Sequence, residues 1–452
     1  MVTMSSSADA ASRVGLRRLF WRVHFWAGLV TAPIVLFAAL TGLLYVLAPQ
    51  IEARVHADVD HVAAPAGAVP MSLDVQLAAA RVAMEGAMPR AAVPAFGAGD
   101  TTQVFFAAPP SVHAGHGAGA EHDPGLPRGR IVYVNPYTAQ VAGHLAEMAR
   151  FKTWARKLHA SMLQGDGWRW LIELGASWML VMLATGLALW WPRSQAAGGP
   201  GWRALVPRWR RGRATWRDLH TSLGLLMGGV LAVVLVTGLT WSRHAGENFR
   251  AAQAALGQNS PRPPKDLRST PLDGRSPLGL QAAFEAARAA APGVQMRLTL
   301  PQGQHGVWRI ENFDRGQPDQ RFVLVLDAGS GEPLFRSGWQ DLPLLPKATT
   351  LGIPFHRGEF GVWNQLLLAL AALVAIFSVV SGVVMWRARR PAGRMAAPPI
   401  DAGNVRALPL WLWAVTGAMA WALPVFGISL AVFVGIELAW AAWRRARGSA
   451  LT

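Results

Sequence analysis

Four histidines occupy matched positions in the two halves of this sequence. His24, in "WRVHFWAG", and His220, in "WRDLHTSLG", each follow a Trp-Arg pair at the start of a long apolar stretch. Each has a Gly four residues later and the Gly of a Thr-Gly pair 18 residues later. His159, in "KLHASMLQGDGW", and His356, in "PFHRGEFGVW", stand nine and seven residues before the Trp that opens another apolar stretch. Imidazoles paired in this way predict a metal centre shared between helices.

The residue types that are present narrow the chemistry of such a centre. The chain has no Cys, which excludes disulfides, iron–sulfur clusters, thiolate zinc sites, a catalytic cysteine and the covalent attachment of c-type haem. Two imidazoles leave zinc short of its usual four ligands, whereas they are what a non-covalent b-type haem in a helical bundle requires. We therefore expect two bis-His haems, one between His24 and His220 and one between His159 and His356. Any one of these histidines alone would more simply be an interfacial anchor.

Basic side chains beside the histidines are candidates for pairing with haem propionates. They are Arg22 and Arg217 at the first pair, and Arg357, Arg156 and Lys157 at the second. Glycines on the same helices could make room for a flat macrocycle, although small residues also serve ordinary helix packing; these are Gly28, Gly42, Gly224 and Gly238. No residue is assigned a catalytic role.

Other features of the sequence do not add a second cofactor. His244 has no counterpart in the other half and is expected at the surface. The His-rich segment "HAGHGAGAEHD", which spans 113–123, could bind a metal weakly but is expected to be a solvated loop. Neither a phosphate-binding Gly-rich loop nor a nucleotide-binding βαβ unit is evident, so the sequence predicts no site for NAD or flavin.

The elements that must position the histidines are membrane helices. Of the 452 residues, 52% are hydrophobic and 15% are charged, which is too apolar for an ordinary soluble protein. Four stretches reach the ~20 residues that a helix needs to cross a bilayer: 19–48, 168–191, 219–241 and 361–386. A further stretch, 408–443, is divided by Pro424 and flanked by basic residues. We expect it to form a hairpin of two spans rather than one overlong helix, which gives six spans in all.

The basic residues indicate how the chain is oriented in the membrane. The formal charge of +17 is concentrated in segments that fall on one side if the spans alternate, namely 1–18, 192–218, 387–407 and the tail 444–452. The positive-inside rule places these segments in the cytoplasm and places 49–167 and 242–360 on the opposite side. The charge is therefore explained by topology and by contact with membrane lipid, and no nucleic-acid partner is expected.

The two outer segments are predicted to be copies of one fold. Each reads as a helix followed by short strands, with the turns "VNPYTAQ" and "LDAGSGE" at the same place. A Thr/Ser-Gly-x-x-x-Trp pattern closes the span that follows each segment. The sequence thus predicts a unit of span, α+β domain and span, present twice as a parallel repeat with its pseudo-twofold axis along the membrane normal. Such an axis brings equivalent histidines to the same depth.

The ordered motifs resemble the PepSY-associated transmembrane family of bacterial inner-membrane proteins over about residues 15–390. The resemblance is carried by "WRVHFWAG", "KLHASMLQGDGWRWLIELGA", "WRDLHTSLG" and "PFHRGEFGVWNQLLLAL", together with the Thr/Ser-Gly patterns. It implies a membrane α-helical bundle of four core spans plus the C-terminal hairpin, with two periplasmic PepSY-like domains at 49–167 and 242–360.

The family includes iron-regulated proteins and haem-containing reductases of ferric siderophores. The resemblance implies an oxidoreductase that takes electrons from a cytoplasmic reductase or a quinol and passes them through haems at His24/His220 and His159/His356. The acceptor would be ferric siderophore or Fe(III) in the periplasm. Reduction would release the iron, because hard oxygen ligands hold Fe(III) more firmly than Fe(II).

Three other functions remain open from the sequence. One is a haem relay between the quinone pool and another periplasmic acceptor, and a second is a non-enzymatic, membrane-anchored PepSY regulatory module. The third is a permease for a siderophore or metal. The spans contain few charged residues beyond Glu173 and Glu437, which disfavours a permease. An anchor needs only one helix and leaves the matched histidines unexplained.

Overall fold

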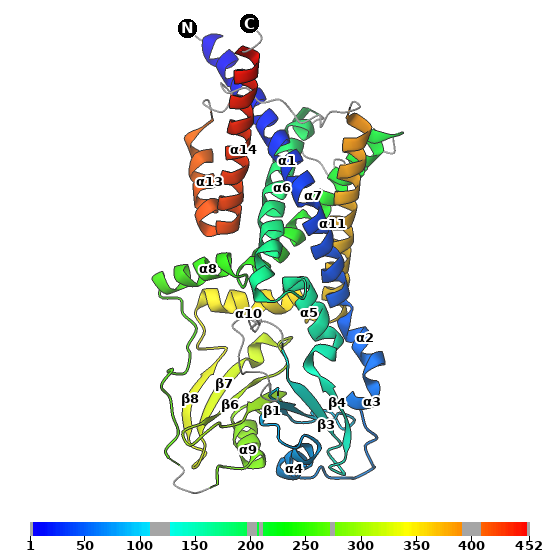
Figure 1. Cartoon of the computed structure of the whole chain (residues 1–452), viewed down its shortest axis with the longest axis vertical. Coiled ribbons are helices and arrows are strands. Elements are labelled where there is room, and N and C mark those ends of the chain that lie inside the picture. Colours follow the sequence, from blue (N-terminus) through cyan, green and yellow to red (C-terminus); the bar gives the residue numbers. More distant parts are fainter. Residues whose placement is uncertain are drawn as a thin grey trace. The chain divides into compact units, whose positions relative to one another are not determined.

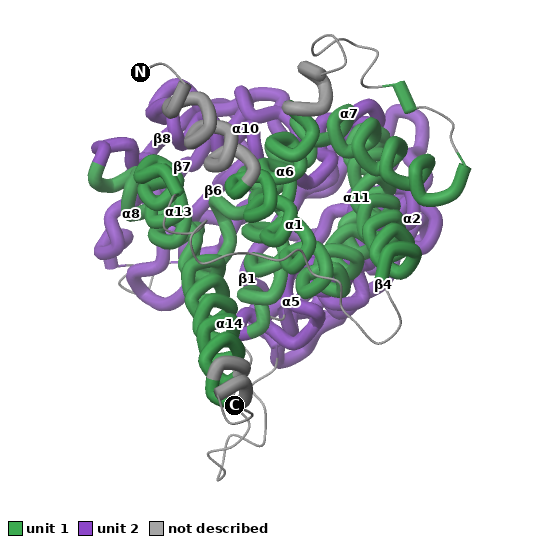
Figure 2. The backbone as a smooth tube through the Cα atoms, turned by 90° about the horizontal axis from the view of Figure 1, so that it is seen from above, with its two compact units in different colours: residues 1–43, 168–255, 366–452 green, residues 44–167, 256–365 purple. Residues whose placement is uncertain are grey.

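The computed structural model describes residues 3–108, 127–196, 206–207, 211–271, 276–390 and 408–449. The chain divides into a helical unit and a sheet unit (Figure 2). The helical unit contains residues 1–43, 168–255 and 366–452, and the sheet unit contains residues 44–167 and 256–365. The His-rich loop 113–122 lies outside the described residues, so its predicted character is not tested.

The helices of the helical unit carry the predicted spans. They are α1 (Thr3–Val46), α6 (Arg169–Ala196), α7 (Arg213–Leu239), α8 (His244–Ala255), α11 (Val362–Arg389), α13 (Leu410–Ala422) and α14 (Pro424–Ser449), of which α1 and α11 continue into the sheet unit. Among the described residues, five helical segments are long and apolar enough to cross a membrane: Gly15–Val46, Asp166–Trp191, Arg213–Leu239, Val362–Arg389 and Pro424–Trp443. The chain is therefore a multi-pass membrane protein.

The helix at the predicted sixth span is shorter than the five long apolar segments. The predicted hairpin does break at Pro424, but its first arm, α13, has only 13 residues. At ~1.5 Å per residue it extends about 20 Å, which is less than the ~30 Å of the hydrocarbon layer. Pro409 precedes this helix and Pro424 opens the next one, so the two prolines limit its length. The second arm, α14, is long enough to span and continues beyond residue 443 to Ser449.

Small side chains and apolar contacts pack the helices of this unit. Met227 and Leu231 of α7 meet Ala371, Val374 and Ala375 of α11 in one buried cluster. Gly175 of α6 faces Ile34 of α1 so closely that a Cβ at this position would lie 2.8 Å from Cγ2 of the isoleucine. Close approach at small residues is the usual way in which membrane helices gain packing contacts.

The few charged groups in these apolar helices have partners. Arg22 of α1 pairs with Glu437 of α14 at 2.5 Å. Glu173 of α6 is 1% exposed and accepts the backbone N–H groups of His244 and Ala245, at the start of α8. This arrangement satisfies a buried carboxylate with the unpaired donors of a helix N-terminus. The two acidic residues that the sequence singled out therefore anchor helices to one another.

The sheet unit contains one antiparallel sheet of eight strands. The strands are β1 (Pro89–Val93), β2 (Thr102–Phe106), β3 (Arg130–Val134), β4 (Val141–Ala146), β5 (Met296–Thr299), β6 (Val307–Asn312), β7 (Phe322–Asp327) and β8 (Pro333–Gly338). They follow the order β4-β3-β2-β1-β5-β6-β7-β8. The helices are α2 (Ala48–Val55), α3 (Ala57–Asp60), α4 (Leu73–Ala83), α5 (Phe151–Ser161), α9 (Leu280–Ala290) and α10 (Leu344–Arg357), with 3₁₀ turns at Glu147–Ala149, Asp166–Trp168 and Pro318–Gln320.

The two outer segments differ from the prediction in that they share this sheet instead of forming separate domains. Each segment supplies a helix and then four strands in the same order, and β1 pairs with β5 through Ala91↔Thr299 and Ala92↔Leu298. Pairing these strands removes two exposed sheet edges. One apolar core continues across the junction under α4 and α9, which lie side by side on one face of the sheet (Figure 1).

The turns after the third strand of each segment are built alike. Asn135 accepts the backbone N–H of Tyr137 at 2.9 Å, and Asp327 accepts those of Gly329 and Ser330 at 2.8 and 2.9 Å. Burial would raise the pKa of Asp327, but hydrogen bonds from the backbone of Ser330, Thr270 and Gly329 outweigh it and lower this pKa. The side chains of "VNPYTAQ" and "LDAGSGE" thus close equivalent turns.

The helices α4 and α9 cap each other across the junction. Asp74, the second residue of α4, accepts the N–H of Leu280 at 2.7 Å, and Gln281, the second residue of α9, accepts the N–H of Leu73 at 2.9 Å. Each side chain therefore satisfies the first helical N–H of the opposite helix. A Cβ at Gly279 would lie 2.8 Å from the Asp74 carboxylate, so this glycine permits the approach.

Replacing Asp74 with Ala is expected to lower the stability of the sheet unit by about 1 kcal/mol, because a helix loses its only side-chain cap. Gln281→Ala should have a similar effect. The measurement is thermal unfolding of the purified protein in detergent. Asp58→Ala, which removes an exposed carboxylate from the first turn of α3, is the matched control. Equal melting temperatures for Asp74→Ala and Asp58→Ala would contradict the capping role.

Candidate functional site

His24 and His220 meet within the helical unit. His24 lies on α1 and His220 lies on α7, and the centroids of their rings are 6.4 Å apart with the planes at 79°. The two histidines are far apart in the sequence, so the fold brings them together. The structure therefore places this predicted pair within reach of one shared atom.

A hydroxyl from a third or fourth helix holds each of these rings. The Nδ1 atom of His24 lies 3.0 Å from Oγ1 of Thr185 on α6, and Nδ1 of His220 lies 2.8 Å from Oγ of Ser381 on α11. The hydroxyl is 161 residues after the histidine in both cases. Both hydroxyl residues belong to the Thr/Ser-Gly pattern of the sequence, which predicted no role for them.

The hydroxyls also determine which ring nitrogen carries the proton. Thr185 donates its own hydrogen to the carbonyl of Val181 at 2.8 Å, and Ser381 donates its hydrogen to that of Ser378 at 3.1 Å. Since a hydroxyl has one hydrogen, its oxygen is then an acceptor toward the imidazole. With the hydroxyl hydrogen on the carbonyl, Nδ1 carries the ring proton and Nε2 keeps a free lone pair. This is the tautomer that a histidine needs to ligate a metal through Nε2.

Space beside the rings comes from glycines that follow these hydroxyl residues or lie on the histidine helices. A Cβ at Gly186 would lie 3.3 Å from Cε1 of His24, so a larger residue would crowd the ring. A Cβ at Gly224 or Gly382 would meet no atom within 4 Å, whereas one at Gly28 would contact Sδ of Met182 at 3.5 Å. Of the two glycines nearest the histidines in sequence, Gly224 borders open space and Gly28 packs against a side chain.

His159 and His356 also meet, within the sheet unit. They lie on α5 and α10, and their ring centroids are 6.5 Å apart with the planes at 57°. Both histidines stand in the last turn of an amphipathic helix that ends in a left-handed residue, Met162 (φ 55°) or Gly358 (φ 71°). His159 precedes its cap by three residues and His356 precedes its cap by two. This difference between the helix ends contributes to the unequal spacing in the sequence.

Glu359, for which the sequence predicted no role, joins α5 and α10. These helices carry His159 and His356, which we call the outer pair. Oε1 of Glu359 accepts Nζ of Lys152 on α5 at 3.3 Å and pairs with the guanidinium of Arg357 on α10 at 2.8 Å. In the sequence, the one signal for Glu359 was its position three residues after His356. Glu359 therefore fixes the separation of α5 and α10, and with it that of His159 and His356.

A buried network holds the start of α5. Arg150 pairs with Asp60 at 2.7 Å and with Glu52 at 2.9 Å, and Glu52 also accepts the backbone N–H of Lys152. Burial would lower the pKa of Arg150, but its hydrogen bond to Asp60 and the nearby anionic groups raise it above the ordinary value. Burial raises the pKa of the neighbouring Tyr133 to about 12. Arg150 therefore stays charged and Tyr133 stays neutral over the physiological pH range.

The basic side chains predicted to face propionates mostly have protein partners. Arg22 pairs with Glu437 at 2.5 Å, Arg217 pairs with Asp218 at 2.9 Å, and Arg357 donates to the hydroxyl of Tyr45 at 3.0 Å besides pairing with Glu359. Lys157 lies 4.0 Å from Asp166. Arg156 forms no ion pair or hydrogen bond through its side chain within the described part of the chain. Burial and the charges of Arg357 and Arg315 lower the pKa of Arg156.

The centroid separation of each histidine pair is compatible with two imidazoles that share one iron atom. An imidazole nitrogen binds a metal at about 2.0–2.1 Å, so two trans imidazoles, with a ring radius added on each side, have centroids about 6 Å apart. The observed 6.4 and 6.5 Å agree with this separation. Within the described ranges, no cluster of three or more His, Cys, Asp or Glu side chains could hold a metal ion. A porphyrin supplies the remaining four nitrogens itself.

Replacing Thr185 with Val is expected to weaken retention of haem between His24 and His220 by about tenfold or more. Val keeps the shape of Thr but cannot accept the Nδ1 proton, so the imidazole loses its orientation and becomes a less basic ligand. The midpoint potential of the remaining haem should rise, because a less basic ligand stabilises Fe(III) less. Absorbance-monitored haem titration and redox titration measure both effects.

Thr31→Val is the control for this variant, because the buried Thr31 hydroxyl donates only to the Ala27 carbonyl of its own helix. Indistinguishable haem affinity and potential in the two variants would rule out the positioning role of Thr185.

Two comparisons with known proteins complete the description of the site. A family model described as "PepSY-associated TM region" matches residues 21–389, a range that includes all four histidines, Thr185, Ser381 and Glu359. A search of curated proteins finds no match.

Proposed function

The chain belongs to the PepSY-associated TM region family, and on that premise we propose that it is a b-type haem protein of the bacterial inner membrane that moves electrons to the periplasm. The observation that supports this proposal most directly is the pair of imidazoles at 6.4 Å with both Nδ1 atoms bonded to hydroxyls. A surface anchor has no need of such an arrangement. Two imidazoles of fixed orientation would hold a haem and limit the reorganisation of its iron when it gains or loses an electron.

Two haems b are proposed, one held by His24 and His220 and the other by His159 and His356. A bis-His haem supplies a one-electron Fe(III)/Fe(II) couple. The protein contributes the orientation of Nε2 through Thr185 and the spacing of the outer pair through Glu359. Arg156 is the strongest candidate for pairing with an outer propionate, because it has no protein partner in the described residues.

The proposed direction of transfer follows from the distribution of charge. Basic residues are concentrated in 1–18, 192–218 and 387–407, which the positive-inside rule assigns to the cytoplasm. The sheet unit then belongs to the periplasm. The proposed internal parallel repeat agrees with this topology, and it is supported by the equal sequence separation of the two histidine–hydroxyl pairs and by the symmetry of the strand order about β1 and β5.

The proposed acceptor is Fe(III) bound by a siderophore or another oxygen-rich chelator. One electron converts Fe(III) to Fe(II), which hard oxygen ligands hold less firmly, so the iron is released for uptake. The proposed donor is a cytoplasmic reductase or a quinol, because the sequence has no evident nucleotide-binding motif. With a reductase or quinol as donor and Fe(III) as acceptor, the chain is an oxidoreductase.

The haem assignment predicts that His356→Ala halves the haem content, from about two to about one per chain, while the protein stays in the membrane. The remaining haem is the one between His24 and His220. The ratio of haem to protein in the purified sample measures this change. His144→Ala, which removes an exposed histidine from β4 of the same unit, is the control. An unchanged ratio in His356→Ala, or a colourless wild-type protein prepared with ample haem, would eliminate the assignment.

The transfer function predicts that proteoliposomes reduce external ferric citrate when a reductant is trapped inside, with the basic segments facing the lumen. His24→Ala should lower the rate to that of empty liposomes, because electrons no longer enter the outer haem. Formation of Fe(II) outside is followed with a ferrous chelator that absorbs light. His144→Ala should keep the wild-type rate. A wild-type rate in His24→Ala would refute transfer through the inner pair.

A further inference from the structure

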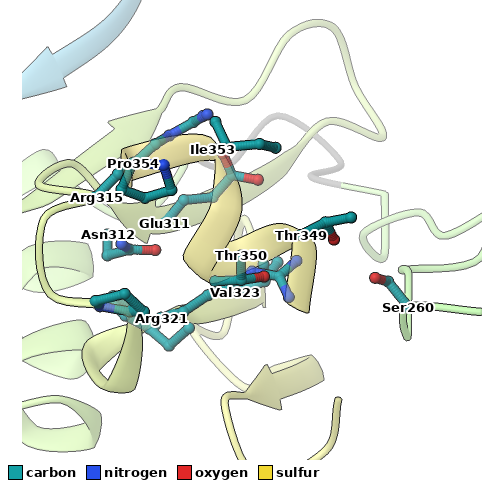
Figure 3. A pocket seen from close by; sticks show the side chains of 12 residues that line it. Ser260, Glu311, Asn312, Arg315, Arg321, Val323, Thr349, Thr350, Ile353 and Pro354 are labelled. Atoms are coloured by element: carbon teal, nitrogen blue, oxygen red, sulfur yellow. The ribbon is translucent and has the colours of Figure 1, made fainter. Parts of the chain in front are cut away.

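The sheet unit has a cavity of about 260 Å³ beside the helix that carries His356. It lies between α10 and the sheet, at the end of β6 and the start of β7. Glu311 and Val323 alternate with the core residues Ile310 and Leu324, so these two lining residues lie on the face opposite α4 and α9. Figure 3 shows the side chains that line it, among them Arg315, Arg321, Thr349 and Thr350. Cavities of this size suit a small ligand or one arm of a larger one.

The cavity has positive charge that the described protein does not neutralise. The side chains of Arg315 and Arg321 make no hydrogen bond or ion pair with any described residue. The one acidic residue in the lining, Glu311, is already paired with Arg309 at 2.5 Å. Two guanidinium groups in a partly enclosed space, with the hydroxyl of Thr350 beside them, can donate to the oxygens of an anion.

The arginine side chains around this cavity repel one another. Burial lowers the pKa of Arg321, and the neighbouring charges of Arg315 and Arg262 lower it further, against the opposing effect of Glu311. Arg315 also contributes to the lowered pKa values of Arg297 and Arg156, where burial is the larger cause. An anion bound among these guanidinium groups would relieve their mutual repulsion.

The cavity is joined to the outer histidine through the backbone. Ile353 and Pro354 line the cavity, and His356 lies within one helical turn of them on α10. The loop that carries Arg315 also touches the end of this helix, because a Cβ at Gly316 would lie 2.4 Å from the carbonyl of Glu359. The position of Arg315 is therefore fixed relative to His356.

We propose that this cavity is the binding site for the substrate, and that the substrate is a small anionic Fe(III) chelate with carboxylate or catecholate oxygens. Arg315 and Arg321 hold its negative charge, and the hydroxyl of Thr350 adds a hydrogen bond. The hydroxyl of Thr349, in contrast, already donates to the Pro346 carbonyl at 2.9 Å. A neutral chelate, such as one made of three monohydroxamates, gains nothing from unpaired guanidinium groups. This inference rests on the proposed function for its choice of an iron chelate, but the binding step itself involves no electron transfer.

Gallium(III) citrate is the probe, because Ga(III) has the charge of Fe(III) and is not reduced. Calorimetric titration of the full-length protein in detergent should show binding, and Arg315→Gln and Arg321→Gln should each weaken it at least tenfold. Arg321→Lys should retain part of the affinity, since it keeps the charge. Arg288→Gln, on α9 at the opposite face of the sheet, is the matched control and should bind like the wild type.

Glu311→Gln distinguishes an electrostatic role from a structural one. Removal of this carboxylate frees Arg309 and increases the positive charge, so gallium citrate should bind more tightly than to the wild type. A variant that merely disturbed the cavity would bind less tightly, and that result would count against the proposal. A melting temperature close to that of the wild type shows that each variant is folded.

Three results would overturn the proposal: wild-type affinity in both arginine variants, equal affinity for metal-free citrate or inorganic phosphate, and equal affinity for neutral gallium tris(acetohydroxamate). The binding test is independent of haem, so it should give the same affinity in His356→Ala. Binding without reduction of ferric citrate in liposomes would reject the proposed function and leave the anionic site standing. Reduction of ferric citrate without binding of gallium citrate would reject the anionic site and leave the proposed function standing.

Discussion

The hydrogen bond between a helix hydroxyl and the Nδ1 atom of a histidine is the interaction on which the inner site depends. A carboxylate could orient the imidazole as well, but it would place a charge among apolar helices at considerable cost. Thr185 and Ser381 avoid that cost, because each hydroxyl first satisfies a carbonyl of its own helix and then accepts the imidazole proton. A neutral donor chain of this kind orients a ligand without adding a charge to the membrane.

The outer site depends on charged groups instead, since the sheet unit contains polar networks. Glu359 bridges α5 and α10 through Lys152 and Arg357, and Arg150 ties the start of α5 to Glu52 and Asp60. The joined sheet makes this possible. Because β1 pairs with β5 and the helices α4 and α9 cap each other, the two segments that carry His159 and His356 belong to one compact unit. If the two segments formed separate domains, the distance between His159 and His356 would be free to vary.

The sequence was sufficient to predict the features that are repeated or periodic. Matched Trp-Arg and Thr-Gly positions identified His24 and His220, and apolar length identified the spans, because both signals are local. The pairing of β1 with β5 had no such signal, since any antiparallel edge strand offers the same backbone groups. The ion pair of Arg22 with Glu437 joins residues 415 positions apart, and the partner of His24 lies on another helix. The length of α13 depended on two prolines, of which sequence reasoning weighed only Pro424.

The proposed electron transfer and the alternative of ion transport make different demands on charged side chains in the spans. Glu173 and Glu437, the acidic residues that the sequence marked in the spans, are both engaged, one by a helix N-terminus and the other by Arg22. Neither is available to carry a cation along the described helices, whereas an electron needs no charged path, only fixed ligands. Arg156, Arg315 and Arg321 of the sheet unit, in contrast, have no anionic partner among the described residues. Arg315 and Arg321 therefore remain available to an anion, which is what the proposed binding of an anionic iron chelate requires.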